Sequence, residues 1–326
     1  MSRFARRVIS AMLLGVVVYG IAVLYAGLGQ MRASLATFSW LSFLLALTLA
    51  SSNYLVRFLK WQYYLRRLEI RGIPALDSLL VFLSGFVLTV TPGKVGEVFK
   101  SAVLAKTHGV PIARTAPIVV AERLTDAIGV IMLIVIGSAA YAGGFGWALA
   151  GTAAVAIGLL FIVWERPMLA LLALLERRHG RFARLSPKLR EAYRSLRIVA
   201  GPTALLWPTF LSVVAWAAEG LALYVILRGF SAQVPLGVAV FFYSTATLAG
   251  ALVPVPGGLG VAEAMIQEQL VRLGHVLQGP ATASMILIRF ATLWWAVAVG
   301  FGALFVLRLR FPEQLREARE LEQQGA

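Results

Sequence analysis

Five ionisable side chains within long apolar runs are the first candidates for chemistry in this chain. They are Glu122, Arg123, Asp126, Glu219 and Arg289. A charge near the centre of a membrane-spanning helix costs roughly 3 kcal/mol on insertion scales, so five unpaired charges facing lipid would cost on the order of 15 kcal/mol. We therefore expect them to face the protein interior, paired or hydrated. Structural roles compete with ligand binding: the first three could snorkel from a helix end, and Arg289 could form a structural ion pair.

Two glycine- and proline-rich motifs, TPGKVGE at 91–97 and PVPGGLG at 254–260, are the second group of candidates. Because proline removes a helix donor and glycine weakens a helix, each motif should be the turn between two short helices. The helix after each turn would present free N–H groups and its positive end at mid-membrane, where they can bind phosphate. The residues concerned are Gly93, Lys94, Gly96, Glu97, Gly257, Gly258, Gly260 and Glu263. The alternative is that the two glutamates cap these helices themselves.

The composition indicates which elements must position these residues. Of 326 residues, 60% are hydrophobic and only 14% are charged, and the mean hydropathy is +0.82. Such a chain cannot form the polar surface of a soluble enzyme, and it is unlike a disordered scaffold. With no cysteine and three scattered histidines, we expect no disulfide, no metal site, no cofactor and no catalytic residue.

The apolar runs predict an all-α integral membrane protein with six full transmembrane helices and two re-entrant helical hairpins. The six spans are Val8–Leu28, Leu35–Val56, Pro117–Tyr141, Gly146–Trp164, Thr203–Leu227 and Ala281–Leu307. The hairpins are the runs 78–104 and 238–273, which contain the two motifs. The first arm of the first hairpin, Ser78–Val90, would be about 20 Å long, too short to cross the roughly 30 Å hydrocarbon core.

The basic residues predict the orientation. With both termini in the cytoplasm, 25 of the 30 Lys and Arg fall on the cytoplasmic side and three outside, as the positive-inside rule requires. Among the cytoplasmic segments, 57–67 and 176–197 mix cations with aromatic residues. Both are expected to lie on anionic lipid as interfacial helices, with an entry path for lipid head groups as the alternative.

The two halves of the chain resemble each other at an offset of about 164–166 residues. Pro92-Gly93 aligns with Pro256-Gly257, Arg123 with Arg289, and Thr37 with Thr203. Within a single domain, 1–326, the chain then divides into an N-terminal anchor (1–30), a first repeat (35–141), a linking span with a basic segment (146–200), a second repeat (203–307) and a tail (308–326). The predicted orientations make the repeats antiparallel, as in many secondary transporters, unless the likeness of two Gly/Pro-rich segments is fortuitous.

Four motifs in this order resemble one known family. PGKVGE (92–97), ERLTD (122–126), PGGLGVAEA (256–264) and the in-span Arg289 are similar to the lysylphosphatidylglycerol synthase transmembrane-region family. These are flippase-like proteins related to the membrane half of the multiple peptide resistance factor. The resemblance covers nearly the whole chain and implies lipid translocation or handling. Because about sixteen residues follow Arg310, we expect no synthase domain.

Together these features predict a lipid flippase or lipid transporter of the bacterial cytoplasmic membrane. Its substrate would be a phosphate-bearing lipid, namely an aminoacyl-phosphatidylglycerol, another phospholipid or a polyprenyl-phosphate carrier. Arg123, Arg289, Lys94 and the helix N-termini would bind the phosphate between the hairpin tips. The carboxylates, Glu97, Glu122, Asp126, Glu219 and Glu263, would balance charge or meet an amine.

Two other functions remain open. One is a non-transporting membrane partner of a lipid-synthesis or glycolipid-synthesis complex. The other is a lipid glycosyltransferase or phosphotransferase, which is disfavoured because the chain has neither a DxD nor an HxxxxD-type motif. The expected partners are anionic or zwitterionic membrane lipids and no nucleic acid, with a homodimer or an association with a lipid-synthesis enzyme as further possibilities.

Overall fold

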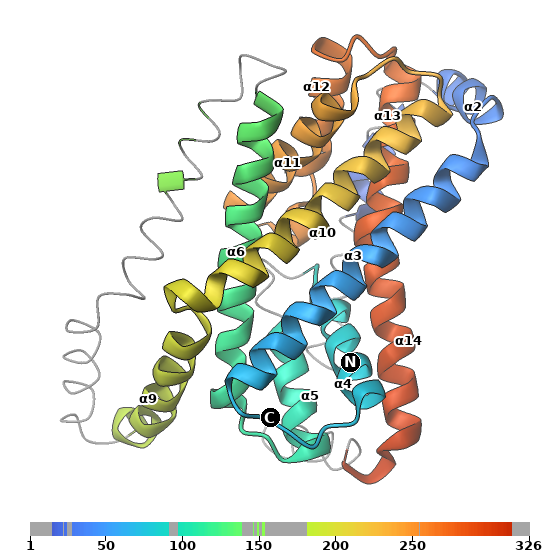
Figure 1. The fold of residues 1–326 in the computed structure, drawn as a ribbon. Helices are drawn as coiled ribbons and strands as arrows, with labels where there is room; N and C mark the ends of the chain where they lie inside the picture. The colour runs from blue at the N-terminus through green and yellow to red at the C-terminus, as the bar shows by residue number, and fades with distance from the viewer. Residues whose placement is uncertain are drawn as a thin grey trace.

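The computed structural model describes residues 15–21, 23–24, 28–90, 97–138, 146, 149, 152–153, 181–253 and 255–314. Every secondary-structure element within these ranges is helical (Figure 1). Most of the predicted first and fourth spans lies outside the described residues, as do residues 91–96 of the first Gly/Pro motif. The all-helical prediction is therefore confirmed for the part of the chain that is described.

Three helices in the described ranges are long and apolar enough to cross a membrane. They are α3 (Trp40–Arg67), α10 (Pro202–Gly229) and a continuous helix formed by α13 (Gln278–Arg289), the π-helical turn η5 (Phe290–Trp294) and α14 (Trp295–Arg310). They correspond to the predicted second, fifth and sixth spans. A fourth long helix, α6 (Ile112–Ser138), corresponds to the predicted third span, although it begins five residues earlier and contains Pro117.

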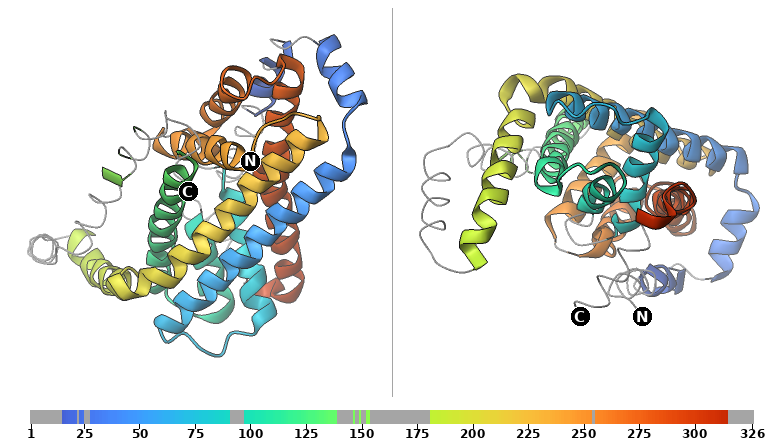
Figure 2. Two further views of the ribbon diagram at one scale, coloured as in Figure 1. Left: turned by 45° about the horizontal axis from the view of Figure 1, so that its top comes forward. Right: turned by 90° about the horizontal axis from the view of Figure 1, so that it is seen from below.

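Helices α3 and α10 lie side by side and run in opposite directions (Figures 1 and 2). At one end, the Ser39 N–H donates to the carbonyl of Gly229 over 3.1 Å. Midway along the pair, the amide Nδ2 of Asn53 donates to the carbonyl of Ala215 over 2.8 Å. A polar side chain in an apolar helix thus forms its hydrogen bond with the backbone of the neighbouring helix.

Each Gly/Pro motif separates two short helices. Helix α4 (Ala75–Ser84) with the 3-10 turn η1 (Gly85–Leu88) precedes the first motif, and α5 (Phe99–His108) follows it. Helix α11 (Leu236–Leu252) precedes the second motif, and the 3-10 turn η4 (Pro256–Gly258) and α12 (Val261–Arg272) follow. In the second turn, Gly257, Gly258 and Gly260 all have positive φ, a conformation that glycine adopts without strain. The two pairs of short helices lie at opposite ends of the molecule in Figure 1.

The two pairs of short helices approach each other in the interior. Val90, at the end of the first arm, and Leu259, in the second turn, belong to one small buried apolar cluster with Leu293 and Val297. The last long helix of each half of the chain also packs on the hairpin of the other half. Helix α6 packs on α11, and α14 packs on α4 and η1. These approaches are close: a Cβ at Gly300 would lie 2.6 Å from the backbone nitrogen of Val87.

The structure contradicts the prediction that 57–67 is an interfacial helix on lipid. Helix α3 has no break after Val56 and continues to Arg67. Arg57, Lys60 and Trp61 are buried, and Trp61 and Tyr64 pack in a core cluster with residues of α4 and α6. The aromatic side chains Trp61 and Tyr64 pack against protein. The second basic segment forms α9 (Arg181–Val199), which packs against α6 and buries Tyr193 and Val199.

Candidate functional site

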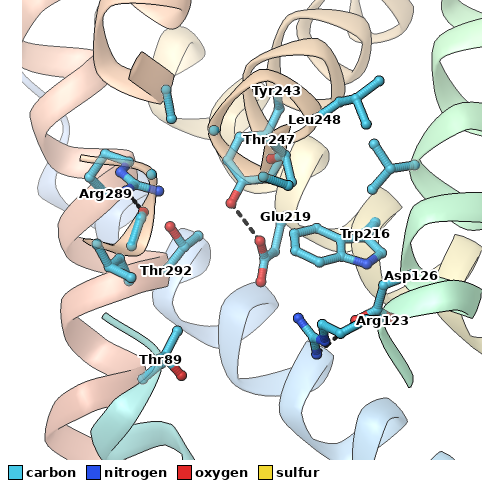
Figure 3. Close-up of a pocket in the computed structure, with 18 of the residues that line it drawn as sticks. Thr89, Arg123, Asp126, Trp216, Glu219, Tyr243, Thr247, Leu248, Arg289 and Thr292 are labelled. Carbon is cyan, nitrogen blue, oxygen red and sulfur yellow. Dashed lines mark hydrogen bonds and ion pairs between the residues drawn. The ribbon is translucent and has the colours of Figure 1, made fainter. Parts of the chain in front are cut away.

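A cavity of about 270 Å³, lined by apolar and charged side chains, lies between the two hairpins and the long helices (Figure 3). Thr89 lines it from the end of the first hairpin arm, and Gly257 and Gly258 line it from the second turn. The ionisable residues that line it are Arg57, Arg123, Asp126, Glu219 and Arg289. Figure 3 shows Arg289 on one side, Arg123 and Asp126 on the other, and Glu219 between them. Segments from both halves of the chain therefore build one chamber.

On one side of the cavity, charged residues of α3, α6, α5 and the turn before α5 form what we call the α3–α6 cluster. Its members are Arg57, Lys60, Glu97, Lys100, Glu122, Arg123 and Asp126. Asp126 lies at its centre, because its carboxylate is 2.7 Å from Lys60 Nζ, 3.0 Å from Arg123 Nη2 and 3.8 Å from Arg57 Nη2. Glu97 lies 3.1 Å from Arg123 and 3.5 Å from Arg57. The cluster explains how α3 and α6 tolerate charges in apolar surroundings.

Lys60, which is not among the lining residues of the cavity, fixes the position of Asp126. Its side chain is fully buried, and its ammonium donates to Asp126 Oδ1 over 2.7 Å and to Ser212 Oγ over 2.6 Å. The Ser212 hydroxyl in turn donates to the same Asp126 oxygen over 3.0 Å. Three helices, α3, α6 and α10, are joined by this contact. One carboxylate oxygen of Asp126 is thereby held away from the two arginines.

Lys100 and Glu122 pair deeper in the same cluster, with 2.5 Å between Nζ and Oε2. The ammonium of Lys100 also lies 4.7 Å from the ring centroid of Trp61 and 5.2 Å from that of Phe82, within range of cation–π attraction. Neither member of this pair lines the cavity. The predicted alternative, in which Glu122, Arg123 and Asp126 snorkel from a helix end, is wrong for the two carboxylates, which are almost fully buried.

On the opposite side, Arg289, Glu263, Gly257 and Gly260 form what we call the α12–α13 cluster. Arg289 Nε donates to Glu263 Oε1 over 2.6 Å, and its Nη2 donates to the Gly257 carbonyl over 2.7 Å. The second oxygen of Glu263 accepts from the Gly260 N–H over 2.8 Å at the start of α12. Helix α12 is therefore capped by its own glutamate, as the structural alternative for this motif anticipated.

Glu219 projects from α10 between the two clusters (Figure 3). The Tyr243 hydroxyl of α11 donates to Glu219 Oε2 over 2.5 Å. Other lining residues carry neutral hydroxyl groups, namely Tyr54, Thr89, Thr247 and Thr292. The chamber thus combines charged and neutral hydrogen-bonding groups, which is the composition expected of a site for a polar ligand.

The predicted site residues divide into three groups. Arg123, Asp126, Glu219, Gly257, Gly258 and Arg289 line the cavity, whereas Glu97, Glu122, Gly260 and Glu263 are not among its lining residues. Gly93, Lys94 and Gly96 lie outside the described residues. The described lining residues include three arginines and two carboxylates, whereas the residues that the sequence singled out contain more carboxylates than cations.

Arg57 is a cavity residue that was expected to lie in a cytoplasmic segment. Arg57 is 6% exposed, and it lines the cavity. The signal was present, because Asn53, Arg57 and Lys60 recur at intervals of four and three and so lie on one face of a helix. In the ranges that the structure covers, no three His, Cys, Asp or Glu side chains are grouped so as to hold a metal ion.

Comparison with known protein families matches residues 12–300 to the family described as "Lysylphosphatidylglycerol synthase TM region". The match covers most of the chain and both clusters. A comparison with curated proteins found no match.

Proposed function

Because the chain belongs to the lysylphosphatidylglycerol synthase transmembrane-region family, a family of the membrane parts of lipid-modifying proteins, we propose that it is a multi-pass lipid flippase. It would move a phosphate-bearing lipid between the leaflets of the bacterial cytoplasmic membrane. The observation that carries the proposal is the cavity that the two hairpins share, with Arg57 and Arg123 among its lining residues. Arginine is well suited to phosphate, because its planar guanidinium donates in pairs.

The proposal includes an inverted repeat in which the two hairpins are re-entrant. In its support, α3 and α10 run antiparallel, and the two hairpins lie at opposite ends of the molecule (Figure 1). The helices α4, α5 and α12 have 10 to 12 residues and α11 has 17, so that at 1.5 Å per residue none is about 30 Å long. Two related halves of opposite orientation can exchange inward-open and outward-open states by alternating access.

The lipid head group would occupy the cavity. A volume of about 270 Å³ is at the lower end of small-molecule sites, which suits a head group whose acyl chains stay outside. An aminoacyl-phosphatidylglycerol, another phospholipid and a polyprenyl-phosphate lipid all share the phosphate. The exchange of a charged head group between leaflets needs such a chamber, because a bare charge in hydrocarbon is costly.

Translocation of a fluorescent phosphatidylglycerol in reconstituted vesicles tests the function. We expect transport by the full chain above the rate in protein-free vesicles, and a loss of about tenfold or more in Arg123→Gln, since a charge-assisted hydrogen bond contributes about 1.5–3 kcal/mol. Arg272→Gln is the matched control, because Arg272 is a surface residue whose side chain is 75% exposed. Rates equal to protein-free vesicles for all the candidate lipids, with stable copurification of a lipid-synthesis enzyme, would favour the non-transporting partner instead.

A further inference from the structure

We propose that the two arginines of the α3–α6 cluster, Arg57 and Arg123, bind the phosphate group together with Thr89, and that Arg289 is a structural residue. This inference rests on the proposed function, because it takes a phosphate group as the ligand. It assigns the phosphate to one side of the cavity and adds two residues that the sequence did not single out.

The arginines differ in how many of their donors are already used. Arg289 donates one hydrogen bond from Nε to Glu263 and one from Nη2 to the Gly257 carbonyl. In Arg57, by contrast, Nε and Nη2 are buried atoms that have no hydrogen-bond partner among the described residues. The same holds for Nε of Arg123, whose Nη2 lies 3.0 Å from Asp126 and 3.1 Å from Glu97. A buried donor left without a partner costs about 1–3 kcal/mol, and more when it is charged. A ligand oxygen would satisfy these groups.

The ion pairs of Arg57 do not replace such hydrogen bonds. Its Nη2 lies 3.5 Å from Glu97 and 3.8 Å from Asp126, which is too far for a normal N–H···O bond. Arg57 is nonetheless held firmly, because its guanidinium lies 5.5 Å from the ring centroid of Phe86. A planar cation that is positioned by a ring and lines a cavity is suited to bind an oxyanion.

Thr89 extends the same site on the first hairpin. Its N–H donates to the carbonyl of Phe86 over 3.1 Å, so it lies one 3-10 turn beyond the ring that positions Arg57. Its hydroxyl lines the cavity and has no partner among the described residues. Thr89 can therefore supply a neutral hydrogen bond to the phosphate that the two arginines neutralise.

The charges of the α3–α6 cluster are compatible with an anion in the cavity. Its described members are four cations and three carboxylates, and Glu219 adds a carboxylate to the cavity lining. Lys60 and Ser212 both bind Oδ1 of Asp126, so that this oxygen is already hydrogen-bonded on the protein side. In the α12–α13 cluster, by contrast, one arginine is paired with one glutamate.

Titration of the detergent-purified full chain, followed by its melting temperature, tests the assignment. The probes are dihexanoyl phosphatidylglycerol and inorganic phosphate. For wild type we expect a saturable rise in melting temperature, with an apparent Kd that increases about tenfold or more in Arg57→Gln and several-fold in Thr89→Val. Arg289→Lys should melt at a lower temperature yet keep an apparent Kd close to that of wild type.

Thr115→Val is the matched control for Thr89→Val. Thr115 is also a buried threonine whose hydroxyl has no described partner, but it does not line the cavity. We expect the Kd of Thr115→Val to equal that of wild type. Because Thr89→Val removes one hydroxyl and keeps the side-chain shape, it tests the site even if Arg57→Gln does not fold.

The outcomes separate the ligand from the site. A response to the lipid alone identifies a lipid head group, and an equal response to inorganic phosphate identifies free phosphate; both support the assignment if Arg57→Gln and Thr89→Val weaken it. An unchanged Kd in these two variants, a larger loss in Arg289→Lys, or no wild-type response to either probe overturns it. If phosphate binding depends on Arg57 but no lipid is translocated in vesicles, only the flippase proposal is refuted. If lipid is translocated but the Kd is the same in Arg57→Gln as in wild type, only this inference is refuted.

Discussion

The two charged clusters that face each other across the cavity use arginine in different ways. In the α12–α13 cluster, one arginine meets one glutamate and one carbonyl, and the same glutamate caps a helix. In the α3–α6 cluster, four cations share three carboxylates, and Arg57 and Arg123 keep donors without hydrogen bonds among the described residues. The first arrangement is complete in itself, whereas the second is suited to receive an anion.

The comparison concerns two arginines at positions that align in the sequence but that differ in their hydrogen bonds. Arg123 and Arg289 align in the sequence and line one cavity. Arg289 donates hydrogen bonds to Glu263 and Gly257. Arg123 forms ion pairs with Glu97 and Asp126, but its Nε has no hydrogen bond among the described residues. A buried charge that is fully paired has a structural role, because its removal leaves the partner charge buried without a counter-ion. Charged groups whose donors are not all hydrogen-bonded lower the stability of the fold slightly. Proteins often accept such a loss of stability at binding sites.

Arg289→Gln should have the largest effect on stability, about 3–5 kcal/mol, because it leaves the carboxylate of Glu263 buried without a counter-ion. Glu263 is 2% exposed. Reversible unfolding in mixed micelles, followed by tryptophan fluorescence, would measure the change. In Arg272→Gln, which breaks an exposed pair with Glu268, the loss should stay within about 1 kcal/mol. Similar stability for the two variants would show that the α12–α13 cluster is not a structural tie.

Gly300→Ala should have an intermediate effect, about 1–3 kcal/mol, because its methyl group would press α14 away from the backbone of the first hairpin at Val87. This change tests whether α14, which continues the helix that carries Arg289, also positions the first hairpin on the other side of the cavity. Gly302→Ala is the control, since a Cβ there meets nothing within 4 Å. We expect the control to unfold like wild type or slightly later, because alanine favours a helix over glycine. Equal melting of both variants would contradict this close packing.

Arg57→Gln should have the smallest effect on stability, within about 1 kcal/mol, since Glu97 and Asp126 both keep Arg123 as a partner. The same unfolding measurement would detect the difference from Arg289→Gln. Lys60→Met is the informative neighbour, because it removes the cation closest to Asp126 and should destabilise more than Arg57→Gln. A large loss in Arg57→Gln would mean that Arg57 is as structural as Arg289.

Much of the architecture could be predicted from the sequence. The apolar runs located α3, α10 and the α13–α14 helix, and the Pro/Gly motifs located the interruptions, because the forces involved are local: burial of apolar length and the backbone limits of proline and glycine. The end of α3 was placed wrongly at Val56, because a cationic, aromatic helix face looks the same whether it meets lipid or protein. The face containing Lys60 and Trp61 packs inside only because α4 and α6 cover it.

The sequence by itself determined that the chain is helical and membrane-embedded, where its helices break, and which side chains carry a charge that must be neutralised. Only the tertiary structure decided which charges neutralise which. Lys60 and Asp126 are 66 positions apart, and Lys60 and Ser212 are 152 apart. Electrostatic pairing in a low-dielectric interior depends on distances of a few ångströms and on hydrogen-bond direction. Those quantities exist only once the helices are packed, which is why Arg57 emerged as a cavity residue from the fold and not from the chain.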